Sequence, residues 1–371
     1  MERTHPIVIA NPKPFRLILR DNQDEWVCTT EQINNSTYDY VRLHRLTRFI
    51  DVDLYRPFTL GLGYDGSLIL PFIEQYADVN LALDEFNRII ACCFVGGLYL
   101  EAVSPSDLSL GQIANCGYFR HERPFGESGE LHRAFGEKAA GDLLNIRLYD
   151  PPQITSAEFE EAYSAGKDVL ALAPTMSPTL LVTAFSYYLT AQHREALTHA
   201  WISVEQLVEV LWREKVVSVA KGGDIPKRRK FLESQQWSLA HRVELLFSLG
   251  VIGEDLYKHL NVARPERNDF QHNGAPPSKN AVKSALLGIA DLLGLIAFSN
   301  GQSYDKTLIT RYLSQSGLPR TPAIAPVRAE QVRRNTASHW RRIKPVPGFS
   351  EWDGDFETFE DIQLQRIDTG A

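Results

Sequence analysis

One short segment in the last third of the chain combines residue types that can cleave a phosphodiester. The segment PERNDFQHNG, residues 265–274, contains Arg267, Asn268 and His272 in that order. An arginine presents a permanently charged, forked donor that suits phosphate oxygens, and a histidine titrates near neutral pH. His272 could therefore move a proton at the 2′-hydroxyl or the leaving oxygen of an RNA strand, while Arg267 stabilises charge on phosphorus. This chemistry requires no metal ion.

Helix geometry limits what one copy of this segment can do. Gly274 is a residue type found just beyond helix C-termini, which predicts that His272 lies in the last helical turn, where the helix dipole favours an imidazolium. Five residues of ideal helix separate Arg267 and His272 by about 140° around the axis. Two copies meeting across a symmetry axis are therefore expected to build the site. In the alternative, structural interpretation, Arg267 pairs with Asp269 or Glu266 and His272 only caps the helix.

The elements that must position this segment are helices. Between residues 197 and 212, apolar residues recur at the three-and-four spacing of a helix, with Glu205 and Glu209 beside the stripe. The longest apolar stretch, 285–299, is too short to cross a bilayer and is expected to be a core helix. Pro265 is expected to kink the chain or to restart a helix. Further helical segments are expected at 238–249, 254–260, 265–270 and 278–299.

This arrangement resembles the HEPN superfamily, the helical domains of many RNA-cleaving toxins, abortive-infection proteins and RNA-targeting CRISPR effectors. The family signature is an arginine, a polar residue that is often asparagine, three to five further positions, and a histidine at the end of a late helix. Arg267, Asn268 and His272 match this signature. Glu209 and Arg213 resemble the Glu-x-x-x-basic feature that the family carries on an earlier helix. The resemblance covers residues 179–299.

The resemblance implies a metal-independent endoribonuclease without a cofactor, in which Arg267, Asn268 and His272 are catalytic and Glu209 and Arg213 support them. Two HEPN domains form the composite site of the family, which implies a homodimer through the helical domain. By analogy, we expect a toxin or effector in bacterial defence or stress response, with RNA as substrate and an antitoxin or trigger protein as a further partner.

One alternative within the family accompanies this expectation. The runner-up is a noncatalytic HEPN module that binds RNA or nucleotide or scaffolds a complex. Some family members are also silenced by a partner that modifies a tyrosine two residues after the histidine. Gly274 occupies that position here, so this form of regulation is not expected.

The first part of the chain has a different character. Strand-like runs and an amphipathic helix at 81–94 predict a small sheet covered by at least one helix. The expected fold class is therefore α+β, with a mixed domain followed by an all-α bundle. The strand-like runs are 7–10, 15–19, 25–29, 58–61 and 67–70. The expected parts are a sensor or specificity domain at 1–150, a linker at 151–178, the HEPN-like bundle at 179–300 and a charged tail at 301–371.

Two motifs in the N-terminal part invite a chemical interpretation. The segment GLGYDG, residues 61–66, satisfies GxGxxG, but an apolar stretch follows it and Asp65-Gly66 is a hairpin pair, so a turn is expected. His121, Glu122, Glu130 and His132 lack a regular metal-ligand spacing, so a polar surface loop is expected there. A metal-dependent hydrolase is the least favoured hypothesis, and no metal site is expected.

Charge and cysteine usage set the remaining expectations. The net charge of −7 over 371 residues argues against a wholly basic nucleic-acid coat, but the run Lys227, Arg228, Arg229 and Lys230 is a candidate RNA-binding patch. Residues 311–344 hold eight Lys or Arg against one acid, and residues 351–361 are acidic and aromatic. This tail is expected to be a solvated end. In the alternative hypothesis, its basic part contributes to RNA affinity and its acidic part competes with RNA for the same cationic cleft. The four cysteines form no CxxC or Cys/His spacing, and neither an export signal nor a membrane span is expected, which fits the cytoplasm.

Overall fold

An antiparallel sheet followed by a set of helices makes up the described part of the chain, so the fold class is α+β. The computed structural model describes residues 4–20, 29–34, 43–52, 59–136, 151–220, 225–234 and 236–314. These ranges belong to one compact unit, residues 1–316. Residues 25–28 of one expected strand and residues 315–371 of the expected tail lie outside the described residues.

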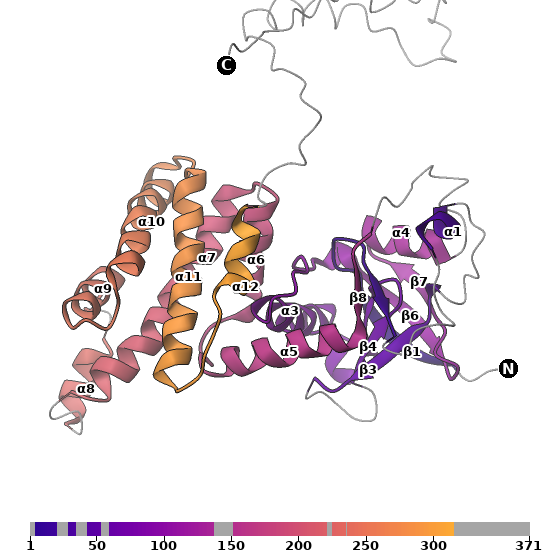
Figure 1. The fold of residues 1–371 in the computed structure, drawn as a ribbon, viewed down its shortest axis with the longest axis horizontal. Helices are drawn as coiled ribbons and strands as arrows, with labels where there is room; N and C mark the ends of the chain where they lie inside the picture. The colour runs from indigo at the N-terminus through magenta and orange to yellow at the C-terminus, as the bar shows by residue number, and fades with distance from the viewer. Residues whose placement is uncertain are drawn as a thin grey trace, which may run out of the picture. The chain divides into compact units, whose positions relative to one another are not determined.

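Among the described residues, the sheet has six strands in the order β3-β4-β5-β1-β6-β7 (Figure 1). Neighbouring strands are all antiparallel, and β1 is central, with Val8 opposite Leu70 on one side and Leu110 on the other. A separate parallel pair joins β2 to β8. The strands are β1 (Thr4–Ala10), β2 (Leu17–Leu19), β3 (Leu46–Ile50), β4 (Leu60–Gly63), β5 (Leu68–Pro71), β6 (Leu108–Ala114), β7 (Phe119–Pro124) and β8 (Gln153–Thr155).

The sheet curls until its two edges meet. An antiparallel bridge joins Arg45, just before the edge strand β3, to Tyr118, just before the opposite edge strand β7. Beside it, the backbone N–H of Phe119 donates to the carbonyl of His44 at 2.9 Å. Because side chains alternate between the two faces of a strand, the curled sheet has one inner and one outer core. The inner core consists of Ile7, Ile9, Leu46, Ile69, Ile113 and Phe119.

A tight turn joins β4 to β5 at the GLGYDG segment. Gly66 adopts a φ of 86°, and the N–H of Gly63 donates to the carbonyl of Ser67 at 2.8 Å. An antiparallel strand follows the turn, whereas a phosphate-binding loop requires a helix at that position. The turn predicted from Asp65-Gly66 is confirmed.

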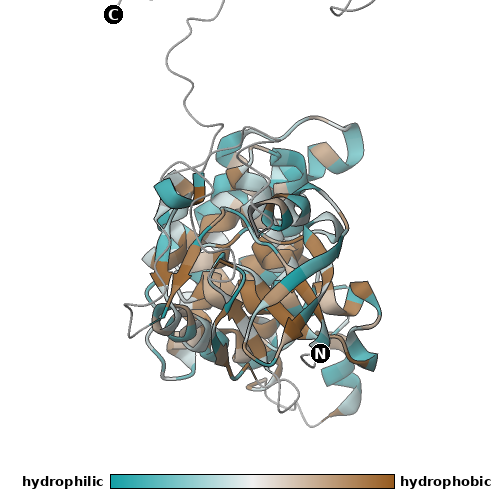
Figure 2. Cartoon of the chain, turned by 90° about the vertical axis from the view of Figure 1, so that its right-hand side faces the viewer, coloured by the Kyte–Doolittle hydropathy of each residue, from teal (hydrophilic) through white to brown (hydrophobic). Residues whose placement is uncertain are grey.

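The outer face of the sheet is covered by α3 (Val79–Val95), which the sequence places correctly to within two residues. The helix begins at Asp78, whose side chain accepts a hydrogen bond from the N–H of Asn80. The central part of its apolar stripe, which includes Phe86 and Ile90, is fully buried. Residues Val8 and Ala10 of β1 belong to the same core as this stripe. Figure 2 shows the corresponding hydropathy, with brown residues gathered inside and teal residues outside.

The interval 151–178, which was expected to be a linker, contains β8 and the sixteen-residue helix α5 (Ser156–Ala171). A capping box starts this helix, because Thr155 and Glu158 bond each other's backbone N–H groups. The helix packs against α3 backbone to backbone. A Cβ atom on Gly166 would lie 1.8 Å from the carbonyl oxygen of Cys92, and one on Gly96 would lie 1.8 Å from that of Ala162. Only glycine fits at these two contact points.

Apart from α1 and α4, which pack beside the sheet, the remaining helices form a bundle whose core is continuous with that of the outer sheet face. Helices α7 and α11 pack against each other and against α10. Helices α7, α9 and α11 match the expected segments to within four residues at each end, and Ser278 caps α11 as a helix start. The helices are α1 (Thr30–Asn34), α4 (Glu127–Gly136), α6 (Pro178–Leu189), α7 (His193–Trp212), α8 (Pro226–Leu232), α9 (Leu239–Ser248), α10 (Glu254–Asn273), α11 (Lys279–Ser299) and α12 (Thr307–Thr310).

Two expectations about these helices need correction. Pro265 neither ends nor restarts a helix, because α10 runs without interruption from Glu254 to Asn273. Pro265 lies on the exposed side of α10, while Leu260 and Ala263 are buried, so packing of the apolar side can compensate for the missing N–H donor. The apolar stretch 285–299, expected to be too short to cross a bilayer, is part of the longer helix α11, which is long and apolar enough to do so; 67% of its most apolar window is buried inside the protein.

The segment after α11 contacts the N-terminal half of the chain. The hydroxyl of Tyr312 donates to the carbonyl of Gly97 at 2.7 Å, and the hydroxyl of Tyr188 donates to the carbonyl of Leu313 at 3.3 Å. The guanidinium of Arg311 also bonds the carbonyl of Gly97. Residues 301–314, which were counted as part of a charged tail, are therefore packed against the folded unit, and Arg311 is not a free tail cation.

Candidate functional site

The C-terminal turn of α10 carries His272 as the sequence predicts. Gly274 ends the helix with a φ of 71°, and its N–H donates to the carbonyl of Phe270 at 2.9 Å. His272 is exposed in this last turn and makes no hydrogen bond or ion pair with the described residues. Its imidazole is therefore open to a ligand, at a helix end that favours positive charge.

Arg267 lies one and a half turns earlier and contacts the neighbouring helix. Its guanidinium is 24% exposed and lies 3.6 Å from the carboxylate of Glu205 on α7. It also donates to the side-chain oxygen of Asn268 at 3.2 Å. The acids expected in the structural interpretation are engaged elsewhere. Glu266 accepts from the N–H and hydroxyl of Ser278, and Asp269 accepts from the amide of Asn273. That interpretation named the wrong acids, although Arg267 does have an acidic neighbour.

Glu209 and Arg213 contact each other at the end of α7. Arg213 donates to Glu209 at 2.6 Å, and Arg242 from α9 bonds the other oxygen of the same carboxylate. Glu209 lies one turn after Glu205 on α7. Glu209 contacts Arg213 and Arg242, and Glu205 lies near Arg267 of α10. Beyond Trp212 the helix widens into a π-helical turn, η4 (Arg213–Val217), a distortion that recurs at functional sites.

The basic run lies on the exposed surface of α8. Lys227, Arg228, Arg229 and Lys230 are all exposed, and Arg229 pairs with Glu233 on the next turn at 3.1 Å. Figure 1 shows α8 at one end of the bundle and the connection from α10 to α11 at the other. One copy of the chain therefore does not bring this basic run to His272.

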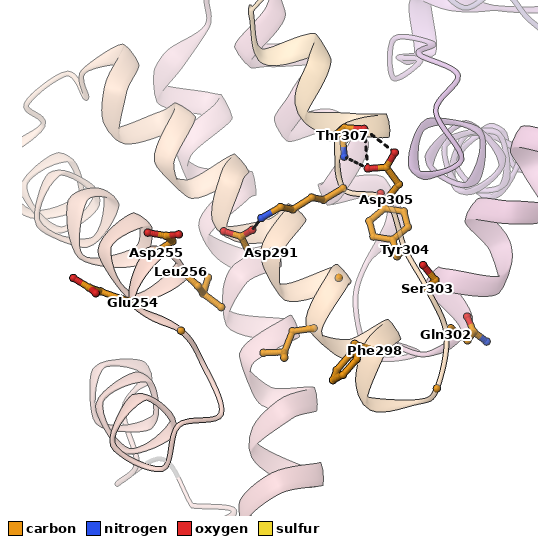
Figure 3. A pocket seen from close by; sticks show the side chains of 15 residues that line it. Glu254, Asp255, Leu256, Asp291, Phe298, Gln302, Ser303, Tyr304, Asp305 and Thr307 are labelled. Carbon is orange, nitrogen blue, oxygen red and sulfur yellow. Dashed lines mark hydrogen bonds and ion pairs between the residues drawn. The ribbon is translucent and has the colours of Figure 1, made fainter.

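The bundle also contains an acidic groove of about 1020 Å³ between the start of α10 and the end of α11 (Figure 3). Asp291 lies in it, bonded to Lys306 at 2.5 Å and to His259 at 3.1 Å. Glu254, which also lines the groove, precedes His272 by eighteen residues, or about 27 Å along the helix. Its surplus of carboxylates disfavours a phosphate backbone, so this groove is distinct from the candidate site on α10.

Three histidines and one aspartate meet in the N-terminal half, where a surface loop was expected. His121 lies on β7 and His132 on α4, and both are buried. The surface-loop prediction is therefore wrong. Asp65, in the β4–β5 turn, accepts from His132 Nδ1 at 2.7 Å and lies 3.7 Å from Nε2 of His44. We refer to His44, Asp65, His121 and His132 as the histidine cluster.

Both ring nitrogens of His121 are buried without a hydrogen-bond partner among the described residues. A buried polar group without a partner costs about 1–3 kcal/mol. Burial, together with neighbouring His44, holds the pKa of His121 well below its ordinary value, so its ring is neutral. Burial alone would raise the pKa of Asp65, but His132 and the other two histidines outweigh it and lower the pKa, so the carboxylate is ionised.

Little in the sequence indicates this cluster. Its members are separated by at least eleven residues along the chain and belong to four different segments. Curling of the sheet brings them together, because the bridge between Arg45 and Tyr118 places His44 beside β7. The local signal is the order of Phe119, Arg120 and His121 in the strand. Phe119 and His121 are buried on one face, and Arg120 between them is exposed on the other.

None of the family models, curated proteins and solved structures compared with the chain matches it.

Proposed function

We propose that the protein is a metal-independent endoribonuclease of HEPN type that acts as a homodimer in the cytoplasm. The observation that carries the proposal is the exposed His272 in the last turn of α10, five residues after an arginine that reaches across to α7. The free thiols of Cys92, Cys93 and Cys116 are consistent with a reducing compartment. A toxin or effector role in bacterial defence, held in check by an antitoxin or trigger protein, is part of this proposal.

In the proposed reaction, His272 accepts the proton of a 2′-hydroxyl, or donates one to the leaving 5′-oxygen. The 2′-oxygen attacks phosphorus, and the bond from phosphorus to the 5′-oxygen breaks. Arg267 stabilises the charge that develops on the non-bridging oxygens. The products are a 2′,3′-cyclic phosphate and a 5′-hydroxyl. Because the two side chains point about 140° apart on one helix, the second copy supplies the complementary pair.

A noncatalytic HEPN module is the second candidate, and the ion pair between Arg267 and Glu205 favours it. An arginine that already has an acidic neighbour can serve to align α10 against α7. In that case the exposed His272 would contribute to binding only.

Cleavage of labelled RNA in EDTA separates these two candidates. We expect the wild-type protein to produce cyclic-phosphate ends, Arg267→Ala and His272→Ala to lose cleavage, and Asn268→Ala to retain part of it. Arg264→Ala on the same helix and His241→Ala on the exposed side of α9 serve as matched controls and should cleave normally. Equal cleavage by wild-type and His272→Ala protein would refute the ribonuclease proposal. RNA binding without cleavage by any variant would favour the noncatalytic module.

Expression in cells tests the biological role separately. Induction of the wild-type chain should arrest growth, and induction of His272→Ala at the same level should not. Growth arrest by both proteins would contradict toxicity through RNA cleavage.

A further inference from the structure

The histidine cluster has the composition of a metal site. His44, Asp65 and His121 each place one ligand atom so that all three atoms lie within 4.8 Å of one another, and all three residues are buried. Imidazole and carboxylate groups together suit Zn²⁺ and other divalent transition metals. We propose that His44, Asp65 and His121 bind one divalent transition-metal ion, with Zn²⁺ the ion that fits this ligand set.

His121 is the observation that points to a ligand. Its ring is 4% exposed, and neither nitrogen has a hydrogen-bond partner among the described residues. A buried imidazole normally bonds through at least one nitrogen. A metal ion between His121, His44 and Asp65 would satisfy this ring, and burial keeps it in the neutral form that ligates metals.

His132 acts in this proposal as a positioning residue. Its Nδ1 lies 2.7 Å from Oδ2 of Asp65, and the hydroxyl of Ser67 donates to the same oxygen at 2.9 Å. Such outer partners orient a ligating carboxylate. Phe119 stacks on His44 with ring centroids 5.3 Å apart, and Phe15 lies 4.9 Å from His132. These contacts restrict the rings and exclude bulk solvent.

Binding requires small adjustments. Ligands at about 2.0–2.1 Å from a tetrahedral Zn²⁺ lie about 3.4 Å apart, so the ligand atoms must approach one another by at most about 1.5 Å. In the structure, Nε2 of His44 lies 2.9 Å from the main-chain carbonyl of His132, to which it donates. Ligation through this nitrogen requires the other neutral tautomer. Three protein ligands leave one coordination position for a water molecule or an anion.

The inference does not depend on the ribonuclease proposal, because the cluster lies in the curled sheet and His272 lies in the helical bundle. The test of the metal site therefore does not require a measurement of RNA cleavage. Untagged full-length protein is stripped with a chelator and titrated with Co²⁺, which gives visible absorption when bound by nitrogen and oxygen ligands. We expect absorption that saturates at one equivalent and that Zn²⁺ abolishes by competition. X-ray absorption of the zinc-loaded protein should show two imidazole ligands and no sulfur.

Variants localise the site. His121→Asn and Asp65→Asn should lose the Co²⁺ absorption and the rise in unfolding temperature that Zn²⁺ gives the wild-type protein. His5→Asn, at an exposed position of β1 in the same sheet, is the matched control and should bind as wild type does. Circular dichroism in EDTA checks that each variant is folded. If either cluster variant does not fold, the wild-type titration and the X-ray absorption decide whether the proposed metal site exists.

Three results would overturn the proposal. The first is wild-type protein that shows neither Co²⁺ absorption nor a Zn²⁺-dependent unfolding temperature. The second is binding that persists in folded His121→Asn. The third is sulfur in the coordination shell, which would place the metal at a cysteine.

Discussion

The guanidinium of Arg267 on α10 lies 3.6 Å from the carboxylate of Glu205 on α7. Both side chains are partly exposed, so the ion pair is screened by solvent and contributes little to stability. The position of this ion pair matters more for ligand binding than its energy does, because a phosphate that binds Arg267 must compete with Glu205.

Removing that competition should strengthen RNA binding. In Glu205→Gln, Arg267 is free to contact a phosphate, so we expect tighter binding of single-stranded RNA at low salt. One additional phosphate contact steepens the slope of log K against log salt by about 0.7. Fluorescence anisotropy over a salt series measures this slope. Glu195→Gln, in the exposed first turn of the same helix, is the control. Unchanged affinity and slope in Glu205→Gln would show that Arg267 does not contact RNA.

Mixing two inactive variants tests the composite site. Arg267→Ala and His272→Ala homodimers each lack one half of the chemistry, whereas a mixed dimer retains one arginine and one histidine. We expect recovery of cleavage after the two proteins are mixed and allowed to exchange subunits. Sedimentation of the wild-type protein should show a dimer at the assay concentration. A mixture that stays inactive, or an active monomer, would contradict a site shared between two copies.

The cysteines should differ sharply in reactivity. Burial raises the pKa of the Cys92 thiol to about 11 and that of Cys93 well above its ordinary value, so neither forms the reactive thiolate at neutral pH. Cys116 is exposed. Iodoacetamide at pH 8 should therefore modify Cys116 quickly and spare Cys92 and Cys93 until denaturant is added, as mass spectrometry of peptides can show. Rapid labelling of Cys92 in the native protein would contradict the packing of α3 against α5.

Two glycines with open space around them should respond to alanine in opposite directions. A Cβ atom on Gly274 or on Gly294 would meet no atom within 4 Å. Gly274 has a φ of 71° at the end of α10, so Gly274→Ala should lower the free energy of unfolding by about 1–2 kcal/mol. Gly294 lies inside α11, where alanine should raise it by about 0.5–1 kcal/mol. Urea unfolding measures both, and shifts in the same direction would contradict the helix end at Gly274.

The sequence was most informative where structure is local. Three-and-four spacing located α3 and α7, a long apolar stretch located α11, and Gly274 correctly indicated the end of α10. The same reasoning divided α10 at Pro265, because sequence patterns do not show that packing of Leu260 and Ala263 can offset a missing backbone donor. Helix α5 was missed although Thr155 and Glu158 carry its start signal.

The histidine cluster could not be predicted in the same way. His44, Asp65 and His121 meet because the edges of a curled sheet close on each other, and closure depends on pairing between segments far apart in the chain. The lack of a regular metal-ligand spacing among His121, Glu122, Glu130 and His132 led to the prediction of a surface loop, whereas β7 and α4 bury both histidines. Long-range topology, rather than residue type, was the missing information.

The hydrogen bond from Tyr312 to the carbonyl of Gly97 also has a consequence for biosynthesis. The two residues are 215 positions apart in the chain. At typical ribosomal rates, roughly 10–40 s pass between the synthesis of Gly97 and that of Tyr312. During that interval the end of α3 lacks its C-terminal cover, and Phe94, whose ring lies 5.8 Å from that of Tyr312, lacks one of its packing partners. The core of the N-terminal half is therefore complete only after nearly all of the described chain has been synthesised.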